Sequence, residues 1–286
     1  MEKSDSKLIL GTVQFGLDYG VCNTSGMVGQ NEVRKILNFA KNNNIQMLDT
    51  AFRYGDSEKT LGANNVKDFQ IITKTSLLDE GVGSVISNFH TSLERLKLES
   101  VEGLMIHNID DVYHPNFDNL YTELKSLQED GLINRLGFSI YTPEQIDHIL
   151  SYFDFELIQL PFNIFDSRLI KHGHLKNLKN RNIEIHARSI FLQGLLLDFE
   201  SLPNYFKTWK VEFDTYQKLV RDSGFSLMDY ALGYAINMKE IDYLVVGVNN
   251  SRQLEEIVSS SKKVVDANRY DIEDINLLNP SLWETD

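Results

Sequence analysis

Four polar residues of complementary chemistry follow short apolar segments in the N-terminal half of the chain: Asp49, Tyr54, Lys74 and His107. The unperturbed pKa of a phenol is about 10, and a neighbouring ammonium group favours the phenolate and lowers that pKa. Lys74 would therefore tune Tyr54 as a proton donor, and Asp49 would keep the lysine charged and oriented. His107 would hydrogen-bond the oxygen of a substrate. Together these residue types predict a tyrosine general acid for reduction of a carbonyl group, with the hydride supplied by a nicotinamide cofactor.

Each of these residues also has a structural interpretation. Asp49 could cap the end of a strand, and Tyr54, which precedes a glycine, could be a half-buried turn residue. Lys74 could be a solvated residue at a strand end, and His107 a hydrogen-bonded core histidine. Taken singly, His107 favours the structural interpretation. The coincidence of all four at strand ends favours the catalytic interpretation of the set.

Eight short segments rich in apolar residues recur along the chain, at residues 7–13, 45–51, 69–75, 101–107, 135–140, 157–162, 183–189 and 243–248. Amphipathic segments separate most of them, at residues 31–43, 84–96, 117–131, 143–152, 170–180, 226–237 and 251–259, and the second connection, at 57–62, is short. Parallel strands need such crossover connections, and near-continuous apolar strands indicate burial on both faces. Eight units in about 250 residues predict one α/β domain over residues 1–286, a (β/α)8 TIM barrel.

A doubly wound open sheet is the alternative fold. It would place a glycine-rich phosphate loop after the first strand, whereas residues 11–16 read GTVQFG and lack the GxGxxG spacing. In a barrel, the four polar residues converge on the carboxyl-end rim, where barrel enzymes carry their sites. Residues 108–116 and 191–209 are irregular and would overhang that rim, and residues 266–286 would close over it as a C-terminal flap.

The composition excludes several classes of partner. The formal net charge is −13, without a cluster of lysines and arginines, so we expect no binding to nucleic acid, which needs a basic face. No stretch approaches the roughly 18 apolar residues that span a bilayer, so we expect no membrane insertion. The single cysteine, Cys22, allows no disulfide framework, and with no signal-like N-terminal segment it predicts a cytoplasmic protein. His172 and His174 lack further ligands, so we expect no metal.

The segment around Tyr54 resembles the signature of the aldo-keto reductase family, since residues 48–58 read LDTAFRYGDSE and residues 61–62 read LG. Further family-like segments follow in order: GT at 11–12, ITK at 72–74, LMIH at 104–107, LGFS at 136–139 and IQ at 158–159. The resemblance extends over roughly residues 8–256. It implies a barrel that binds NAD(P)H in an extended pose without a Rossmann domain.

By this resemblance, Asp49, Tyr54, Lys74 and His107 are the catalytic residues. Two residues on neighbouring strands would hydrogen-bond the nicotinamide carboxamide, residues 193–195 would run beside the pyrophosphate, and the turn at 247–253 would hold the adenosine phosphate at a helix N-terminus. The implied cofactor-binding residues are Gly11, Thr12, Asp49, Ser139, Gln159, Arg188, Ser189, Gln193, Gly194, Leu195, Gly247, Asn249, Arg252 and Gln253, of which Ser139 and Gln159 are the carboxamide pair.

The chain departs from the family pattern at two places. Arg188 stands where the family usually has an aromatic residue that stacks on the nicotinamide. A guanidinium plane can stack on a ring, clamp a phosphate or face an anionic substrate, and a plain surface arginine is the structural alternative. In the eighth unit, Asn249 and Ile257 replace the usual cation and asparagine, which leaves Arg252 as the nearby cation for a 2′-phosphate. Family habit and Arg252 predict NADPH, with NADH as the alternative.

The sequence thus predicts an NAD(P)H-dependent oxidoreductase that reduces an aldehyde or ketone to an alcohol with Tyr54 as general acid. The substrate would be a small carbonyl compound, and Arg188 would favour an anionic or sugar-derived one. The alternative function is a nicotinamide-cofactor-sensing binding protein with little or no turnover, and a third is a barrel isomerase or lyase that binds no nicotinamide. We expect a monomer or a weak homo-oligomer.

Overall fold

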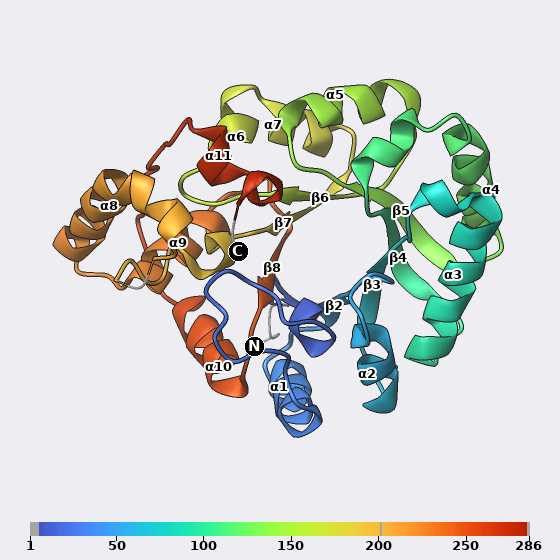
Figure 1. Cartoon of the computed structure of the whole chain (residues 1–286), viewed down its shortest axis with the longest axis horizontal. Helices are drawn as coiled ribbons and strands as arrows, with labels where there is room; N and C mark the ends of the chain where they lie inside the picture. Colours follow the sequence, from blue (N-terminus) through green and yellow to red (C-terminus); the bar gives the residue numbers. More distant parts are fainter. Residues whose placement is uncertain (1–5, 201, 285–286) are drawn as a thin grey trace.

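Eight parallel strands close into a barrel in the computed structural model, which describes residues 6–200 and 202–284. They are β1 (Leu8–Gly11), β2 (Met47–Asp49), β3 (Gln70–Lys74), β4 (Val101–Ile106), β5 (Ile133–Ser139), β6 (Leu157–Pro161), β7 (Glu184–Arg188) and β8 (Tyr243–Gly247). Each strand pairs with the next in sequence, and β8 closes the ring on β1, where Gly247 lies opposite Gly11 (Figure 1). The predicted (β/α)8 barrel is confirmed, and the open sheet is excluded.

Most of the α-helices form an outer ring around the strands (Figure 1). They are α1 (Gln30–Asn42), α2 (Ser57–Ala63), α3 (Val82–Leu96), α4 (Phe117–Glu129), α5 (Pro143–Tyr152), α6 (Arg168–Lys171), α7 (His174–Asn180), α8 (Lys210–Ser223), α9 (Leu227–Ile236), α10 (Ser251–Ser260) and α11 (Ile275–Leu278). The single helix predicted at 170–180 is wrong, because Gly173 takes φ +71 and divides it into α6 and α7. The prediction also missed α8, which ends at Gly224 with φ +78.

Two apolar layers separate the inside of the barrel from its outer face. The large core cluster joins the outward-facing strand residues to the helices, and a small cluster fills the barrel interior with Ile9, Met47, Ile72, Met105 and Leu157. Since these five come from β1, β2, β3, β4 and β6, the interior is a packed core rather than a pore. A small molecule bound by the barrel strands must therefore lie outside this layer, at a rim of the barrel.

Several connections lie at the carboxyl-end rim. The β1–α1 connection, residues 12–29, begins with the short helix η1 (Val13–Phe15) and runs across the front of the barrel in Figure 1. The expected irregular connections contain η3 (Ile109–Tyr113) after β4, and η4 (Leu192–Gly194) and η5 (Asn204–Trp209) after β7. Residue 201 of the last connection lies outside the described residues.

The C-terminal segment packs on loops of the same rim. Backbone N–H groups of Tyr270 and Ile272 donate to the carbonyl oxygens of Ile164 and Phe165, which follow β6. The Trp283 ring meets an aromatic side chain of η5 edge to face. The expected flap therefore rests against these two loops, and residues 285–286 lie outside the described part of the chain. Within the described ranges, no helix is long and apolar enough to cross a membrane.

Candidate active site

The polar residues of the site are the next inward-facing layer above the apolar interior. Side chains two residues apart on a strand share a face, so the positions two residues beyond the five interior residues also point inward. These positions are Gly11, Asp49, Lys74, His107 and Gln159. The period of the strands thus brings three of the four predicted catalytic residues to the same end of the barrel, together with two predicted cofactor residues, Gly11 and Gln159.

A buried ion pair lies at the centre of this layer. Lys74 Nζ donates to Asp49 Oδ1 at 2.7 Å and to the carbonyl oxygen of Thr50 at 3.0 Å. Gln159 Nε2 donates to the other carboxylate oxygen, Asp49 Oδ2, at 2.6 Å. The Lys74 and Asp49 side chains are 1% and 4% exposed. Burial lowers the pKa of Lys74, and the Asp49 carboxylate opposes that shift. The pair is therefore held by hydrogen bonds on both sides, as a buried charge pair requires.

Tyr54 reaches the ion pair from the loop between β2 and α2. Its ring meets the imidazole of His107 edge to face, with the ring centroids 5.6 Å apart, and Lys74 Nζ lies 5.1 Å from the centroid of the tyrosine ring. Close backbone packing fixes the loop, because a Cβ added to Gly16 would lie 2.0 Å from the carbonyl oxygen of Tyr54. Gly55 takes φ +54 against the same turn. The four predicted catalytic residues thus meet at one place.

The electrostatic setting keeps Tyr54 protonated. Burial raises the pKa of its phenol, and the Asp49 carboxylate raises it further. The sequence led us to expect a lowered pKa for Tyr54. The pKa is raised instead, because burial and the Asp49 carboxylate outweigh the cations Arg188 and Arg53. His107 is neutral, since burial and then the charge of Lys74 lower its pKa to about 3. Its Nδ1 is buried without a hydrogen-bond partner in the described ranges. The site therefore offers a protonated phenol beside a neutral imidazole.

Ser139 and Gln159 lie side by side next to this group. They are partners in the register of β5 and β6, and both side chains are buried. Gln159 uses its amide nitrogen on Asp49, which leaves its carbonyl oxygen as an acceptor. A hydroxyl group and an amide oxygen are thus presented together beside the ion pair.

Arg188 ends β7 and is half-buried rather than a free surface residue. Its guanidinium carbon lies 4.3 Å from the centroid of the Tyr141 ring, and its nitrogen atoms donate to the Ile140 carbonyl oxygen at 3.0 Å and to Ser189 Oγ at 3.3 Å. Arg188 pairs with Pro161, two residues beyond the inward-facing Gln159, so it lies on the inward face of β7 at the same rim.

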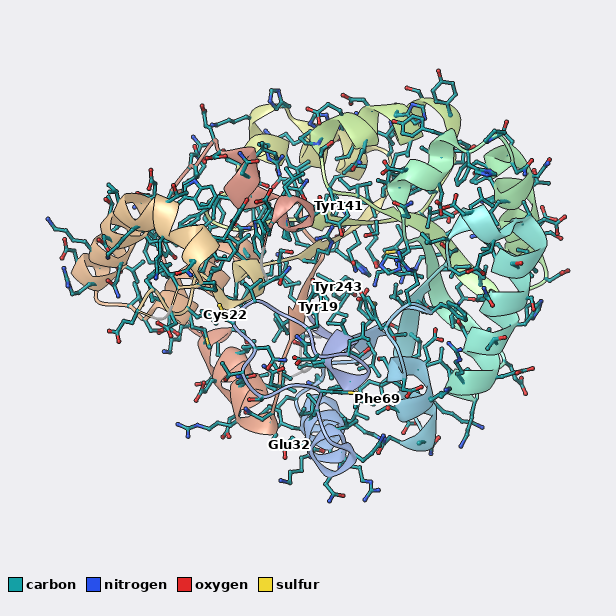
Figure 2. All side chains as sticks on the ribbon, in the orientation of Figure 1. Tyr19, Cys22, Glu32, Phe69, Tyr141 and Tyr243 are labelled. Atoms are coloured by element: carbon teal, nitrogen blue, oxygen red, sulfur yellow. The ribbon has the colours of Figure 1, made fainter. Side chains whose placement is uncertain are left out.

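Two tyrosines that sequence reasoning missed complete this side of the rim. Tyr141 lies under Arg188, and Tyr19 comes from the β1–α1 connection (Figure 2). Tyr19 is 43% exposed, and partial burial and then the neighbouring Tyr54 raise its pKa. Gln193 Nε2 donates to Tyr19 Oη at 3.3 Å and so links two rim loops. Isolated aromatic residues in irregular loops carry no periodic signal that would have identified them.

Other predicted cofactor residues belong to the framework below the site. Thr12 is fully buried, donates to the Asp49 carbonyl oxygen at 2.9 Å, and shares a 2.9 Å hydrogen bond with Ser57 Oγ. Leu195 is buried in the main core. Gly194 takes φ +98, and a Cβ there would lie 2.9 Å from the Cβ of Cys22.

The last group of predicted cofactor residues surrounds the N-terminus of α10. Asn250 Oδ1 caps this helix by accepting from the Gln253 N–H at 2.9 Å, and Gln253 Oε1 accepts from the Asn249 N–H at 2.7 Å. Arg252 is 85% exposed and pairs with Glu256 at 3.0 Å. Sequence reasoning missed a further contact, in which Glu32 of α1 accepts hydrogen bonds from Ser251.

The described residues contain no group of three or more His, Cys, Asp or Glu side chains that could hold a metal ion. A cavity of about 690 Å³ lies between α9 and α10, and none of the four predicted catalytic residues lines it. The polar groups described at the rim are the buried ion pair, the phenol and the imidazole.

Two known proteins are similar to this chain over part of its length. Glyoxal reductase of Bacillus subtilis is 27% identical over 179 residues, 60% of this chain and 63% of that protein, so the match spans less than two thirds of that relative. L-galactose dehydrogenase of Arabidopsis thaliana is 28% identical over 248 residues, 76% of this chain and 73% of that protein.

Solved structures show the same barrel. A glycerol dehydrogenase from Gluconobacter oxydans superposes with a TM-score of 0.73 at 22% identity, covering 93% of this chain and 89% of that one. An aldo-keto reductase from Bacillus halodurans, in its holo form, gives 0.73 at 20% identity, covering 91% and 87%. The profile of the aldo/keto reductase family matches residues 7–278. With a match of that extent, the chain belongs to the aldo-keto reductase family.

Proposed function

We propose that this protein reduces an aldehyde or ketone to an alcohol with a reduced nicotinamide dinucleotide, and that Tyr54 is its general acid. The observation that carries the proposal is the buried Asp49–Lys74 pair, with Lys74 Nζ 5.1 Å from the centroid of the Tyr54 ring. Burying two charges costs desolvation free energy, and this pair adjoins a protonated phenol. That combination fits proton transfer to an oxygen that gains negative charge.

Each of the four residues has a distinct part in the proposed reaction. His107, neutral at physiological pH, donates a hydrogen bond to the carbonyl oxygen and orients it toward Tyr54. As the carbonyl carbon is reduced, the phenol of Tyr54 gives its proton to the developing alkoxide. The positive charge of Lys74 stabilises the phenolate that remains, and Asp49 keeps Lys74 charged and in place.

The inner rim fits a nicotinamide. A carboxamide has donor and acceptor groups, and the Ser139 hydroxyl with the free amide oxygen of Gln159 can match them. Both residues lie beside Asp49, so a ring held there would adjoin Tyr54. When bound, the reduced nicotinamide supplies the hydride for the carbonyl carbon. Gly247, opposite Gly11 on β1, packs against the side chain of Gln14, which would border the rest of the dinucleotide.

A small polar carbonyl compound is the proposed substrate. The similar proteins are named for glyoxal, L-galactose and glycerol, which are small molecules rich in oxygen. Arg188 adds a half-buried positive charge at the rim, held against Tyr141. A cation shielded from water attracts an anion more strongly than an exposed one does, so carboxylated or phosphorylated carbonyl compounds, including sugar derivatives, are the preferred class.

Turnover distinguishes this function from a cofactor-sensing binding protein. Purified protein is mixed with NADH or NADPH and a panel of aldehydes and ketones, and oxidation of the nicotinamide is followed by absorbance. The expected result is turnover by the wild type and near-complete loss in Tyr54→Phe. Nucleotide binding without turnover on any carbonyl compound would favour the binding protein, and no nucleotide binding would favour a barrel isomerase or lyase.

A further inference from the structure

Glu32 places a carboxylate at the N-terminus of α10, although it belongs to α1. Its Oε1 accepts from the backbone N–H of Ser251 at 2.8 Å and from Ser251 Oγ at 2.6 Å. Its Oε2 accepts from Lys35 Nζ at 2.9 Å. The hydrogen bonds from Lys35 and Ser251 lower the pKa of Glu32 to about 2. Glu32 is therefore ionised at neutral pH and fixed by contacts with two helices.

This carboxylate occupies a position that a phosphate would need. The first amides of a helix attract an anion, and the turn before α10 is where the family resemblance puts the adenosine end of the cofactor. The amide of Ser251 is bonded to Glu32, the amide of Gln253 to Asn250, and the amide of Asn249 to Gln253. A 2′-phosphate carries close to two negative charges and would meet the Glu32 carboxylate here.

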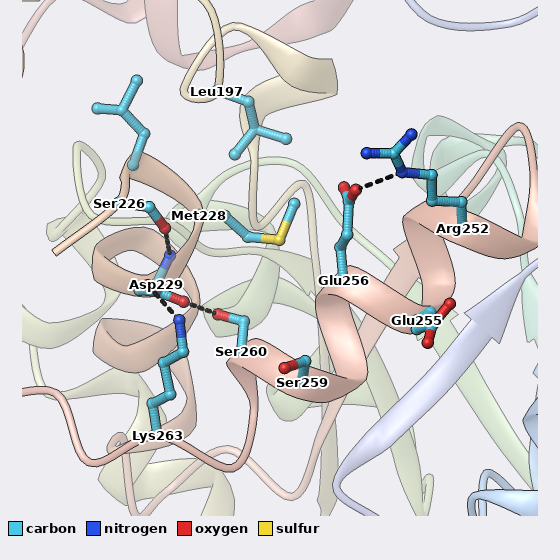
Figure 3. Close-up of a pocket in the computed structure, with 11 residues that line it drawn as sticks. Leu197, Ser226, Met228, Asp229, Arg252, Glu255, Glu256, Ser259, Ser260 and Lys263 are labelled. Carbon is cyan, nitrogen blue, oxygen red and sulfur yellow. Dashed lines mark hydrogen bonds and ion pairs between the residues drawn. The ribbon is translucent and has the colours of Figure 1, made fainter.

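The neighbouring cations are already paired with carboxylates. Lys35 binds Glu32, and Arg252 binds Glu256 (Figure 3). The side chain of Arg252 borders the cavity between α9 and α10, whose lining contains three carboxylates, Asp229, Glu255 and Glu256, and two cations, Arg252 and Lys263. A phosphate bound here would compete with Glu32 for Lys35 and with Glu256 for Arg252. The surroundings of Arg252 therefore do not favour a phosphate.

The unpaired polar atoms nearby are acceptors. Gln14 Oε1 and Asn249 Oδ1 are buried oxygen atoms without a hydrogen-bond partner among the residues described. Gln14 lies against Gly247, since a Cβ added to that glycine would come within 2.8 Å of its side chain. A ribose hydroxyl donates and accepts and so can pair with either end of these amides, whereas a 2′-phosphate dianion could pair only with their nitrogen atoms and not with the unpaired oxygens.

We infer that this protein binds NADH in preference to NADPH and that Glu32 sets the preference, an inference that rests on the nicotinamide-dependent function proposed above. The contacts of Arg252 and Glu32 thus favour NADH, whereas the family resemblance suggested NADPH. Glu32 excludes the 2′-phosphate by repulsion and by holding the Ser251 amide, and it leaves the ribose 2′-hydroxyl a carboxylate to bond.

The test compares two dinucleotides and two mononucleotides that differ only by the 2′-phosphate. Fluorescence titration gives the dissociation constants of NADH and NADPH, and displacement of bound NADH gives those of 5′-AMP and adenosine 2′,5′-bisphosphate. The variants are Glu32→Gln, which keeps an acceptor oxygen for Ser251 without the charge, and Glu123→Gln, which removes an exposed acid on α4. Thermal unfolding of each variant shows whether it is folded.

The expected result is that wild-type protein binds NADH at least about tenfold more tightly than NADPH, and 5′-AMP more tightly than the bisphosphate. Glu32→Gln should remove most of this difference by strengthening NADPH, and Glu123→Gln should leave it unchanged. Equal or tighter binding of NADPH by the wild type would overturn the inference but leave the proposed function intact. An undiminished preference in folded Glu32→Gln would overturn the role of Glu32. If neither dinucleotide bound, the proposed function and the inference would both fail.

Discussion

The Tyr54 ring and the His107 imidazole meet edge to face at 5.6 Å, so the phenol adjoins a neutral hydrogen-bonding partner. Tyr54→Phe removes the phenol hydroxyl and little else. We expect kcat for carbonyl reduction to fall by about 10²–10⁴-fold, the usual contribution of a positioned general acid. Fluorescence titration should show nicotinamide binding unchanged. The matched control is Tyr113→Phe, at a tyrosine that is 63% exposed on η3, and a similar loss in both variants would contradict the assignment.

Neutral His107 makes stability depend on pH in a defined direction. Its pKa is about 3 in the folded protein against 6.5 for the free side chain. Between pH 6.5 and pH 3, His107 is therefore protonated in the unfolded chain and neutral in the folded chain. The stability due to neutral His107 is complete above that pH and falls as the pH decreases toward 3, by at most about 1.4 kcal/mol per pH unit.

Urea unfolding between pH 7 and pH 4.5 tests this dependence. His107→Gln should flatten the decline of the unfolding free energy with falling pH, because the buried titrating group is gone. His90→Gln, at an exposed histidine of α3, is the control and should leave the slope as in the wild type. Identical slopes for wild type and His107→Gln would mean that His107 is not buried in its neutral form.

The sequence predicted the barrel because its strand signals are local. Each strand is an apolar segment between helical patterns, and the period of two then fixes which residues face inward, so Asp49, Lys74 and His107 were placed correctly. Helix boundaries depended on backbone geometry that residue patterns do not specify. From the sequence, Gly173 is compatible with a continuous helix or with a helix end. In the structure its positive φ separates α6 from α7.

The rest of the site depends on contacts between distant segments. Glu32 bonds a residue 219 positions away, and Gly16 packs on the Tyr54 loop. Neither contact follows from a local pattern. The pKa of Tyr54 was expected to fall near Lys74, but burial, which a sequence does not show, moves it upward. Residue types thus led to the proposed chemistry, whereas burial and long-range packing determine the electrostatics of the site.

The Asp49–Lys74 pair should be essential to stability as well as to activity. Removing one partner of a buried pair leaves the other charge uncompensated, at a cost of about 3–5 kcal/mol. We therefore expect Asp49→Asn and Lys74→Met each to lower the free energy of unfolding by that amount, and the double variant to lose less than the two losses combined. The control is the exposed Lys210–Asp214 pair on α8, whose removal should cost less than about 1 kcal/mol. Additive losses at the buried pair would contradict the coupling.

Backbone packing at Gly16 should position Tyr54. A Cβ there would lie 2.0 Å from the Tyr54 carbonyl oxygen and 2.3 Å from the Ser57 nitrogen. Gly16→Ala must therefore displace the loop, which should cost about 1–3 kcal/mol and lower kcat. The matched control is Gly83→Ala, because a Cβ at that position of α3 meets nothing within 4 Å, and it should stabilise the helix by up to about 1 kcal/mol. Full activity of Gly16→Ala would show that the loop tolerates the shift.

Arg188 should determine which carbonyl compounds are preferred. Its guanidinium packs on the Tyr141 ring and donates to the Ile140 carbonyl oxygen, so its position at the rim is fixed. Arg188→Ala therefore removes a positive charge of fixed position. We expect KM for a carboxylated or phosphorylated carbonyl compound to rise about tenfold or more, since a hydrogen bond to a charged group contributes about 1.5–3 kcal/mol, while KM for an uncharged analogue changes little.

Steady-state kinetics on a matched pair of substrates, one anionic and one neutral, measures this selectivity. Arg188→Lys should restore part of it, because lysine keeps the charge but loses the planar stacking. Arg221→Ala, on the exposed end of α8, is the control for a general loss of positive charge. Equal losses for both substrates in Arg188→Ala would mean that Arg188 supports the site through Tyr141 and Ile140 and does not bind the anion.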